Sequence, residues 1–207
     1  AIMFASGTAD FVVRALVGAD PVIKMTIFPR PEMSAIWLFI VLGLFFSLIG
    51  YSFNKLLIIV LNFFSNLSRI AFIFSGILAG VVIVVIGAYF PEMIGGGYQT
   101  ISQVLDQSFT LSVLLVLFIG RMLMSIFSYG TGVPGGIFAP MLAIGVVFGM
   151  LFGGVVDYFF PDLVSHPGIF AVAGMAGIFA STVRAPLTGL VLAVEMTANY
   201  EMILPLI

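Results

Sequence analysis

Long apolar runs dominate this sequence, and short polar segments separate them. Runs long enough to span a membrane cover Ser34–Phe64, Ile70–Phe90, Thr110–Phe127 and Gly136–Phe160. Because lipid offers no hydrogen-bond partners, such runs are expected to form helices that satisfy their own backbone groups. The apolar residues are continuous and do not alternate, so a membrane β-barrel is not expected. The pattern predicts an all-α integral membrane protein with several spans.

The predicted helices differ greatly in length. As a single helix, Ser34–Phe64 would be about 46 Å long against a hydrocarbon core of about 30 Å, so it must tilt, kink or extend beyond the core. Gln99–Ser108 is too short to span. Gly168–Thr182 and Pro186–Thr197 form a pair of short helices broken at Val183–Ala185, which is typical of a transporter interior. We predict a polytopic bundle of tilted, broken helices of unequal length.

Charge and proline gather in the segment Gly18–Met33, which we expect to be an exposed connector. It separates a first helical stretch, Ala1–Val17, from residues 34–207. The other loops are expected at Ser65–Arg69, Pro91–Tyr98, Ser128–Pro134 and Pro161–Pro167. The sequence starts without methionine and stops within the apolar run MILPLI, so we expect a fragment of a longer polypeptide.

Composition narrows the classes of function. Hydrophobic residues make up 62% and charged residues 8% of the chain, against about 45–50% and about 25% in soluble domains. No basic patch supports nucleic-acid binding. With no cysteine and one histidine, His166, no metal-ligand spacing is present. Neither a Ser/His/Asp arrangement nor a phosphate-binding glycine loop is found, so we expect no enzyme and no cofactor.

Glycines recur at four-residue spacing on two predicted helices. Gly145, Gly149 and Gly153 share one face, and Gly76 and Gly80 share another. Faces of small residues allow helix backbones to approach closely in lipid. We expect close helix packing at both faces.

The segment GTGVPGGIFAP, Gly130–Pro140, carries the candidate chemistry. Its glycines and Pro134 oppose a helix, whereas a long apolar helix follows directly. The unpaired N–H groups at that helix start would be those of Gly136, Ile137, Phe138 and Ala139. Together with the positive end of the helix dipole they would bind an anion without a charged side chain. Chloride suits such a site, although a plain glycine turn between two membrane helices remains the alternative.

The same residues carry a family resemblance. GGIFAP, Gly135–Pro140, matches the GxFxP signature of the CLC family of chloride channels and proton-coupled chloride exchangers. PGGIFAPMLAIG at Pro134–Gly145 and AGMAGIFASTVRAPLTGLVLAVEMT at Ala173–Thr197 both resemble bacterial members, and WLFIVLGLF at Trp37–Phe45 is a weaker match. The similarity runs along the whole chain in family order.

The resemblance implies a site and an architecture. The backbone amides of Ile137 and Phe138 would bind the central chloride, within a motif completed by Gly135, Gly136, Ala139 and Pro140. Members are homodimers built from two inverted halves, so residues 1–17 would be the last helix of the first half. Residues 34–207 would then be the second half, truncated at its C-terminal end. The subunit interface would use Ala1–Val17, Pro186–Thr197 and the stretch starting near Met202.

Proton-coupled chloride exchange in a bacterial inner membrane is the function that the resemblance favours. A passive chloride channel of the same fold is the first alternative, and an unrelated carrier or scaffold is the second. By the resemblance, an anion-binding serine, the gating glutamate and an inner proton-transfer glutamate would precede Ala1. A chloride-contacting tyrosine would follow Ile207. The residues that distinguish exchange from conduction would therefore lie outside this chain.

Isolated charged residues within apolar surroundings are further functional candidates. Arg121 and Arg184 could attract anions, but snorkelling or hydrogen bonds to loop carbonyls are the simpler expectation. Glu195 and Lys55 are expected to be solvated or to cap a helix rather than to transfer protons. His166 is expected to be exposed in its loop rather than to sense pH.

Overall fold

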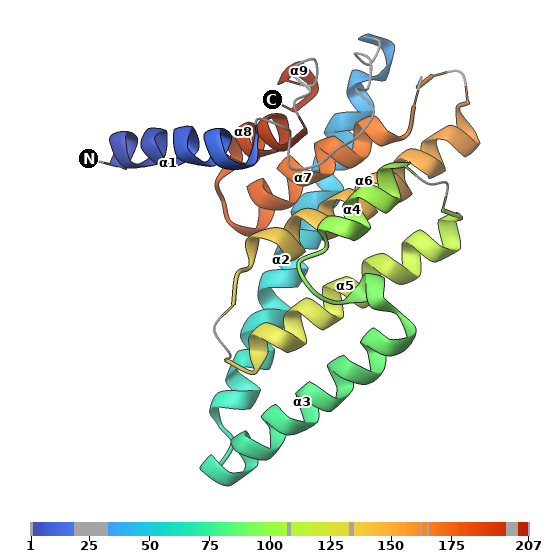
Figure 1. Cartoon of the computed structure of the whole chain (residues 1–207). Helices are drawn as coiled ribbons and strands as arrows, with labels where there is room; N and C mark the ends of the chain where they lie inside the picture. The colour runs from blue at the N-terminus through green and yellow to red at the C-terminus, as the bar shows by residue number, and fades with distance from the viewer. Residues whose placement is uncertain are drawn as a thin grey trace.

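The computed structural model describes residues 2–18, 33–106, 109–132, 135–161, 163–164, 166–197 and 203–206. Within these ranges every regular element is a helix (Figure 1). The α-helices are α1 Ile2–Val17, α2 Ile36–Ser65, α3 Arg69–Tyr89, α4 Tyr98–Asp106, α5 Leu111–Gly130, α6 Phe138–Phe159, α7 Gly168–Thr182, α8 Pro186–Thr197 and α9 Ile203–Leu206, with short 3-10 turns η1 Met33–Ala35 and η2 Pro91–Met93. Apart from its end residues, the predicted connector Gly18–Met33 lies outside the described residues.

The membrane-spanning character predicted from the apolar runs is confirmed. In the described part of the chain, four helices are long and apolar enough to cross a membrane, and they correspond to α2 with η1, α3, α5 and α6. Their lengths run from 20 to 33 residues. The helices α7 and α8 are apolar but shorter, as the sequence pattern predicts. The protein is therefore a multi-pass membrane protein with helices of unequal length.

Two predicted boundaries were wrong around the glycine-rich segment. The helix α5 continues through Ser128 and Tyr129, which were expected to lie in a loop, and it ends at Gly130. Its terminal carbonyl groups are capped by backbone amides, including a 3.0 Å bond from Gly132 N to the carbonyl oxygen of Tyr129. Gly132 has φ +73°, the left-handed conformation that closes helix C-termini. The following helix α6 begins at Phe138, two residues later than expected.

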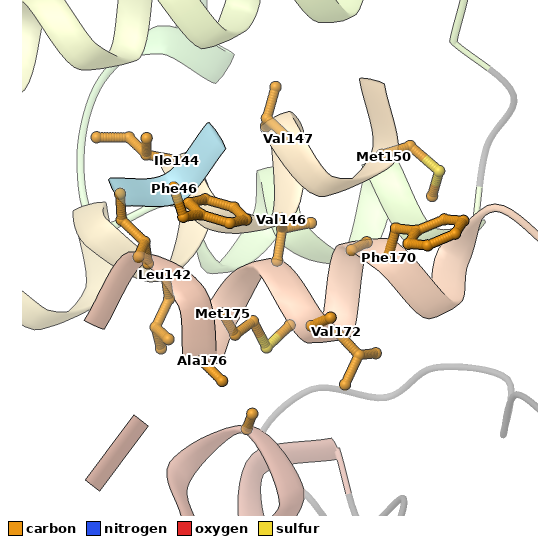
Figure 2. Packing of buried hydrophobic residues seen from close by; sticks show 14 of the residues in the cluster. Phe46, Leu142, Ile144, Val146, Val147, Met150, Phe170, Val172, Met175 and Ala176 are labelled. Carbon is orange, nitrogen blue, oxygen red and sulfur yellow. The ribbon is translucent and has the colours of Figure 1, made fainter. Parts of the chain in front are cut away.

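The core lies where α6 and α7 run alongside each other and α2 packs against them. The side chains of α6 from Met141 to Val147 are all buried, as is most of α7. Figure 2 shows Phe46 of α2, Val146 of α6 and Met175 of α7 among the buried residues of this core. The rings of Phe46 and Phe148 meet edge to face at 5.3 Å. Burial of large apolar groups on all sides of α6 holds this helix in a fixed position within the bundle.

The glycine face predicted on α6 contacts α7 directly. A Cβ at Gly145 or Gly149 would overlap the carbonyl oxygen of Gly174 or of Phe170, respectively. A Cβ at Gly153 would lie 2.6 Å from the carbonyl oxygen of Pro167. Prediction and structure agree here, because only glycine lets the two backbones touch. The expectation of close packing failed for Gly76 and Gly80, whose Cβ positions meet none of the described atoms within 4 Å.

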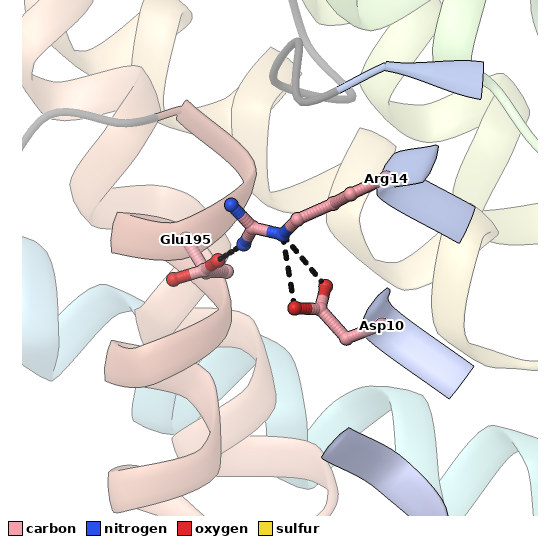
Figure 3. A network of polar contacts seen from close by, with 3 residues as sticks. All are labelled: Asp10, Arg14 and Glu195. Atoms are coloured by element: carbon pink, nitrogen blue, oxygen red, sulfur yellow. Dashed lines mark hydrogen bonds and ion pairs between the residues drawn. The ribbon is translucent and has the colours of Figure 1, made fainter. Parts of the chain in front are cut away.

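The first helix, α1, extends outward from the bundle, and its inner end lies near α8 (Figure 1). Arg14 joins the two elements, as Figure 3 shows. Its guanidinium lies 2.9 Å from Asp10 on the same helix and 3.6 Å from Glu195 on α8. All three side chains are at least half exposed, so each of the two ion pairs adds at most about 1 kcal/mol of stability.

Candidate anion-binding site

The segment Gly135–Pro140 forms the start of α6, as the helix-start interpretation requires. Ile137 precedes the helix with φ −83° and ψ −20°, and its carbonyl oxygen accepts the bond from Met141 N at 3.2 Å. The amides of Ile137, Phe138 and Ala139 therefore come before Met141, whose N–H is the first helical donor, whereas Pro140 has no N–H to satisfy. These amides carry the partial positive charge of the helix N-terminus, the physical requirement for holding an anion.

This helix start lies at the surface of the described chain, although the body of α6 is buried. Gly135 and Gly136 are exposed, and Ile137 is 37% exposed. Four residues further on, Met141 is only 1% exposed. A polar helix end is thus followed directly by turns, Met141–Val147, that lie in the apolar core.

Phe138 anchors the helix start to the neighbouring helix. Its ring meets that of Phe179 on α7 at 5.2 Å in an edge-to-face arrangement. The side chain therefore has a packing role, whereas the predicted anion contact is made by the backbone. An edge-to-face pair contributes about 0.5–1.5 kcal/mol beyond area burial.

A cavity of about 430 Å³ adjoins the motif. It is enclosed by α3, the η2 region, the end of α5 and the start of α6. Gly135, Gly136, Ala139 and Pro140 line it, as do Gly76 and Gly80, which explains why the latter pair makes no close helix contact. Hydroxyl-bearing residues of α5 and its cap face the same space: Ser125, Ser128, Tyr129 and Thr131. The hydroxyl groups of Tyr129 and Thr131 donate hydrogen bonds within the protein, so those of Ser125 and Ser128 are the ones that a small ion in this space would meet.

One of these hydroxyl groups contacts the motif itself. Tyr129 donates a hydrogen bond to the carbonyl oxygen of Gly136. Sequence reasoning missed this contact, because it placed Tyr129 in a loop and nothing in the spacing of the two residues indicates that they meet.

Arg121 does not face the anion motif. It is 1% exposed, and its guanidinium donates to the carbonyl oxygens of Glu92 at 2.7 Å and Ile94 at 3.2 Å and to the Thr100 hydroxyl at 3.0 Å. The simpler expectation, hydrogen bonding to loop carbonyls, is confirmed. The guanidinium also occupies the space beside Gly97, whose φ of +82° favours glycine. Through these hydrogen bonds Arg121 holds the loop that contains Ile94, Gly95 and Gly96, which line the cavity.

The other charged candidates lie away from the motif. Glu195 makes the exposed ion pair with Arg14, consistent with the solvated role expected for it. Lys55 lies 5.7 Å above the ring of Tyr51 on α2, and Arg184 is exposed in the turn between α7 and α8. His166 is exposed as expected, and its Nδ1 accepts a 3.0 Å bond from Gly168 N, which caps the start of α7. Among the described residues, no group of three or more acidic or histidine side chains could hold a metal.

Comparisons with known proteins agree with the fold and with the family resemblance of the sequence. The sequence model of a family described as voltage gated chloride channel matches residues 1–207. The H(+)/Cl(-) exchange transporter ClcA of Vibrio vulnificus is 43% identical over 210 residues, which cover 100% of this chain and 45% of that protein. A transporter of the same name from Yersinia pestis is 36% identical over 97% of this chain and 42% of its own length.

Among solved structures, the crystal structure of a slow cyanobacterial Cl-/H+ antiporter superposes with a TM-score of 0.89 at 36% identity. The match covers 95% of this chain and 46% of that one. These relatives are named as transporters rather than enzymes. The chain spans less than half the length of each relative named here.

Proposed function

This chain belongs to the voltage-gated chloride channel family. On that premise we propose that it is part of the transport domain of a H+/Cl− exchanger, with residues 1–17 as the last helix of the first half and residues 34–207 as the second half, truncated at its C-terminal end. The observation that carries the proposal is the start of α6. Its first amides carry the positive end of the helix dipole at a partly exposed helix start, and Gly135, Gly136, Ala139 and Pro140 of the same motif line a cavity. Such a site can bind chloride without the strong attraction of a full positive charge, so the ion can also leave.

In this proposal the amides of Ile137 and Phe138 are the chloride ligands. Gly135 and Gly136 keep the approach free of side chains, and Ala139 with Pro140 forms the first helical turn. The remaining anion ligands and the proton-transferring carboxylates would come from the rest of a longer polypeptide. The transported ions are chloride and protons, with no cofactor, and the site of action is a bacterial inner membrane.

We also propose that two copies associate through α1, α8 and the stretch near Met202. Exposed apolar side chains on α1 support this arrangement. Met3, Phe4 and Phe11 are 74–88% exposed, so the described part of the chain leaves them uncovered. Light scattering of the purified full-length protein in detergent would give the mass of a dimer. A monomeric mass together with normal transport would refute the dimer and leave the exchange function standing.

The decisive experiment uses the full-length polypeptide that contains these 207 residues, reconstituted in liposomes. Chloride efflux and external pH are recorded together after an outward chloride gradient is imposed. Proton movement against its own gradient, driven by chloride, is the expected result. Chloride flux with no proton movement would instead identify a passive channel, and the absence of chloride flux would refute chloride transport altogether. Liposomes without protein provide the background leak.

A further inference from the structure

The hydroxyl of Tyr129 and the carbonyl oxygen of Gly136 meet at the edge of the cavity. This oxygen belongs to the peptide group that joins Gly136 to Ile137. The other polar end of the same peptide group is the N–H of Ile137, one of the two amides that we propose as chloride ligands. Tyr129 therefore contacts the back of a ligand group rather than the anion itself.

A hydrogen bond at one end of a peptide group controls its other end. The group is planar and trans, so the C=O and N–H bonds point in opposite directions. Holding the oxygen on the side of Tyr129 directs the N–H of Ile137 away from α5. A donor on the carbonyl also polarises the N–H and strengthens the bond that it makes.

The residues next to this peptide group restrict its orientation very little, so a hydrogen bond from elsewhere in the chain is needed to fix it. Gly135 and Gly136 have no Cβ, so the backbone that leads into Ile137 is the least restricted kind. Helical hydrogen bonding takes over only at the bond from Met141 N to Ile137 O. Between these points, the bond from Tyr129 to Gly136 O is the side-chain hydrogen bond that the described residues make to this peptide plane.

The tyrosine is presented by a rigid element. Tyr129 lies in the last turn of α5, next to Gly130, where a Cβ would overlap Val60 of α2. The cap residue Thr131 donates from its hydroxyl to the carbonyl oxygen of Ser128 at 2.7 Å. The end of α5 is thus packed on one side and capped at its terminus, so the Tyr129 hydroxyl starts from a defined position.

We propose that Tyr129 is a positioning residue for the anion site, which fixes and polarises the Gly136–Ile137 peptide so that its N–H faces chloride. The inference rests on the proposed chloride-binding function. It predicts that removal of one hydroxyl weakens chloride binding, although this hydroxyl is not a chloride ligand.

The test uses Tyr129→Phe in the full-length protein, with chloride binding followed by calorimetric titration. Loss of one hydrogen bond predicts a dissociation constant about three- to tenfold higher. In liposomes the chloride concentration for half-maximal flux should rise by a similar factor, while the maximal rate is kept. The matched control is Tyr158→Phe, at a residue 77% exposed on α6, which should leave both values unchanged. A thermal melt of each variant accompanies the titrations.

A double-mutant cycle separates positioning from a general packing effect. Replacing the amide of Ile137 by an ester removes the N–H that Tyr129 is proposed to orient. On this background Tyr129→Phe should change chloride binding by less than about twofold, because coupled groups are not additive. An undiminished effect on the ester background would overturn the inference. With 4-aminophenylalanine at position 129, a weaker donor of nearly the same shape, binding should fall between the tyrosine and phenylalanine forms.

The remaining outcomes are distinguishable. If the unaltered protein shows no chloride binding, the proposed function and this inference both fail. If it binds chloride and Tyr129→Phe binds equally well, only the role of Tyr129 is refuted. If the phenylalanine variant does not fold, the 4-aminophenylalanine form decides the question, and a dissociation constant equal to that of tyrosine overturns the proposal.

Discussion

Replacing Gly149 by alanine is expected to destabilise the α6–α7 contact at one of its tightest points. A Cβ at this position would overlap the carbonyl oxygen of Phe170 and would lie 2.7 Å from the Cα of Ala171. Both are backbone atoms, so no side-chain rotation can relieve the overlap and the two helices must move apart. Separation also reduces the apolar contact on either side of the glycine face, and Phe138 and Phe179 beside the anion motif would shift with it.

The magnitude follows from two opposing terms. Overpacking a close-packed interior costs about 1–3 kcal/mol, and a backbone-to-backbone overlap belongs at the upper end. Alanine is a better helix former than glycine by about 1 kcal/mol, which offsets part of this cost. We expect a net loss of about 2 kcal/mol, and therefore a melting temperature of the full-length protein that is lower by a few degrees, because the shift per kcal/mol decreases with chain length.

The assay is the temperature at which half of the full-length protein remains monodisperse in detergent after a short heat challenge. Gly154→Ala is the matched control, because it places the same methyl group on the same helix. There the Cβ would lie 2.7 Å from Cδ2 of Leu111, the end of a flexible side chain that can rotate away. Equal melting temperatures for the two variants would show that the α6–α7 contact is looser than described, and would refute the reasoning.

Three further substitutions test other parts of the fold. Arg121→Met should lower the melting temperature by several degrees, because it leaves the carbonyl oxygen of Glu92 without its charged donor, a loss of about 1.5–3 kcal/mol. Phe138→Ala keeps the backbone amide but removes the ring contact with Phe179, so chloride binding measured by calorimetry should weaken about two- to tenfold through a less fixed helix start. Arg184→Gly should raise the melting temperature, since Arg184 has φ +59° and a left-handed residue with a Cβ costs about 1 kcal/mol; an unchanged or lower value would contradict this.

The long apolar runs predicted the spanning helices well because lipid leaves the backbone no alternative to internal hydrogen bonding. The boundary near Gly130 was harder. Glycine and serine favour a helix end, and the sequence does not reveal which glycine adopts the left-handed cap conformation. The structure shows that Gly132 does.

The site was only partly predictable, for a related reason. GGIFAP lies within one local segment, so its helix start could be inferred from the residues themselves. The contacts of Tyr129 with Gly136 and of Arg121 with Glu92 depend on how loops fold back on helices. Hydrogen bonds from a side chain to a loop carbonyl leave no residue-type pattern in the acceptor, because any residue presents the same oxygen.

The direct backbone contact between α6 and α7 has a mechanical consequence. With no side chains between them along the glycine face, the two helices have no soft layer in which to slide or tilt, and close-packed interiors compress little. They should therefore behave as one stiff unit that carries the amides proposed as chloride ligands. Any cycle that opens the pathway to one side of the membrane and then to the other would have to move its gates past this stationary part.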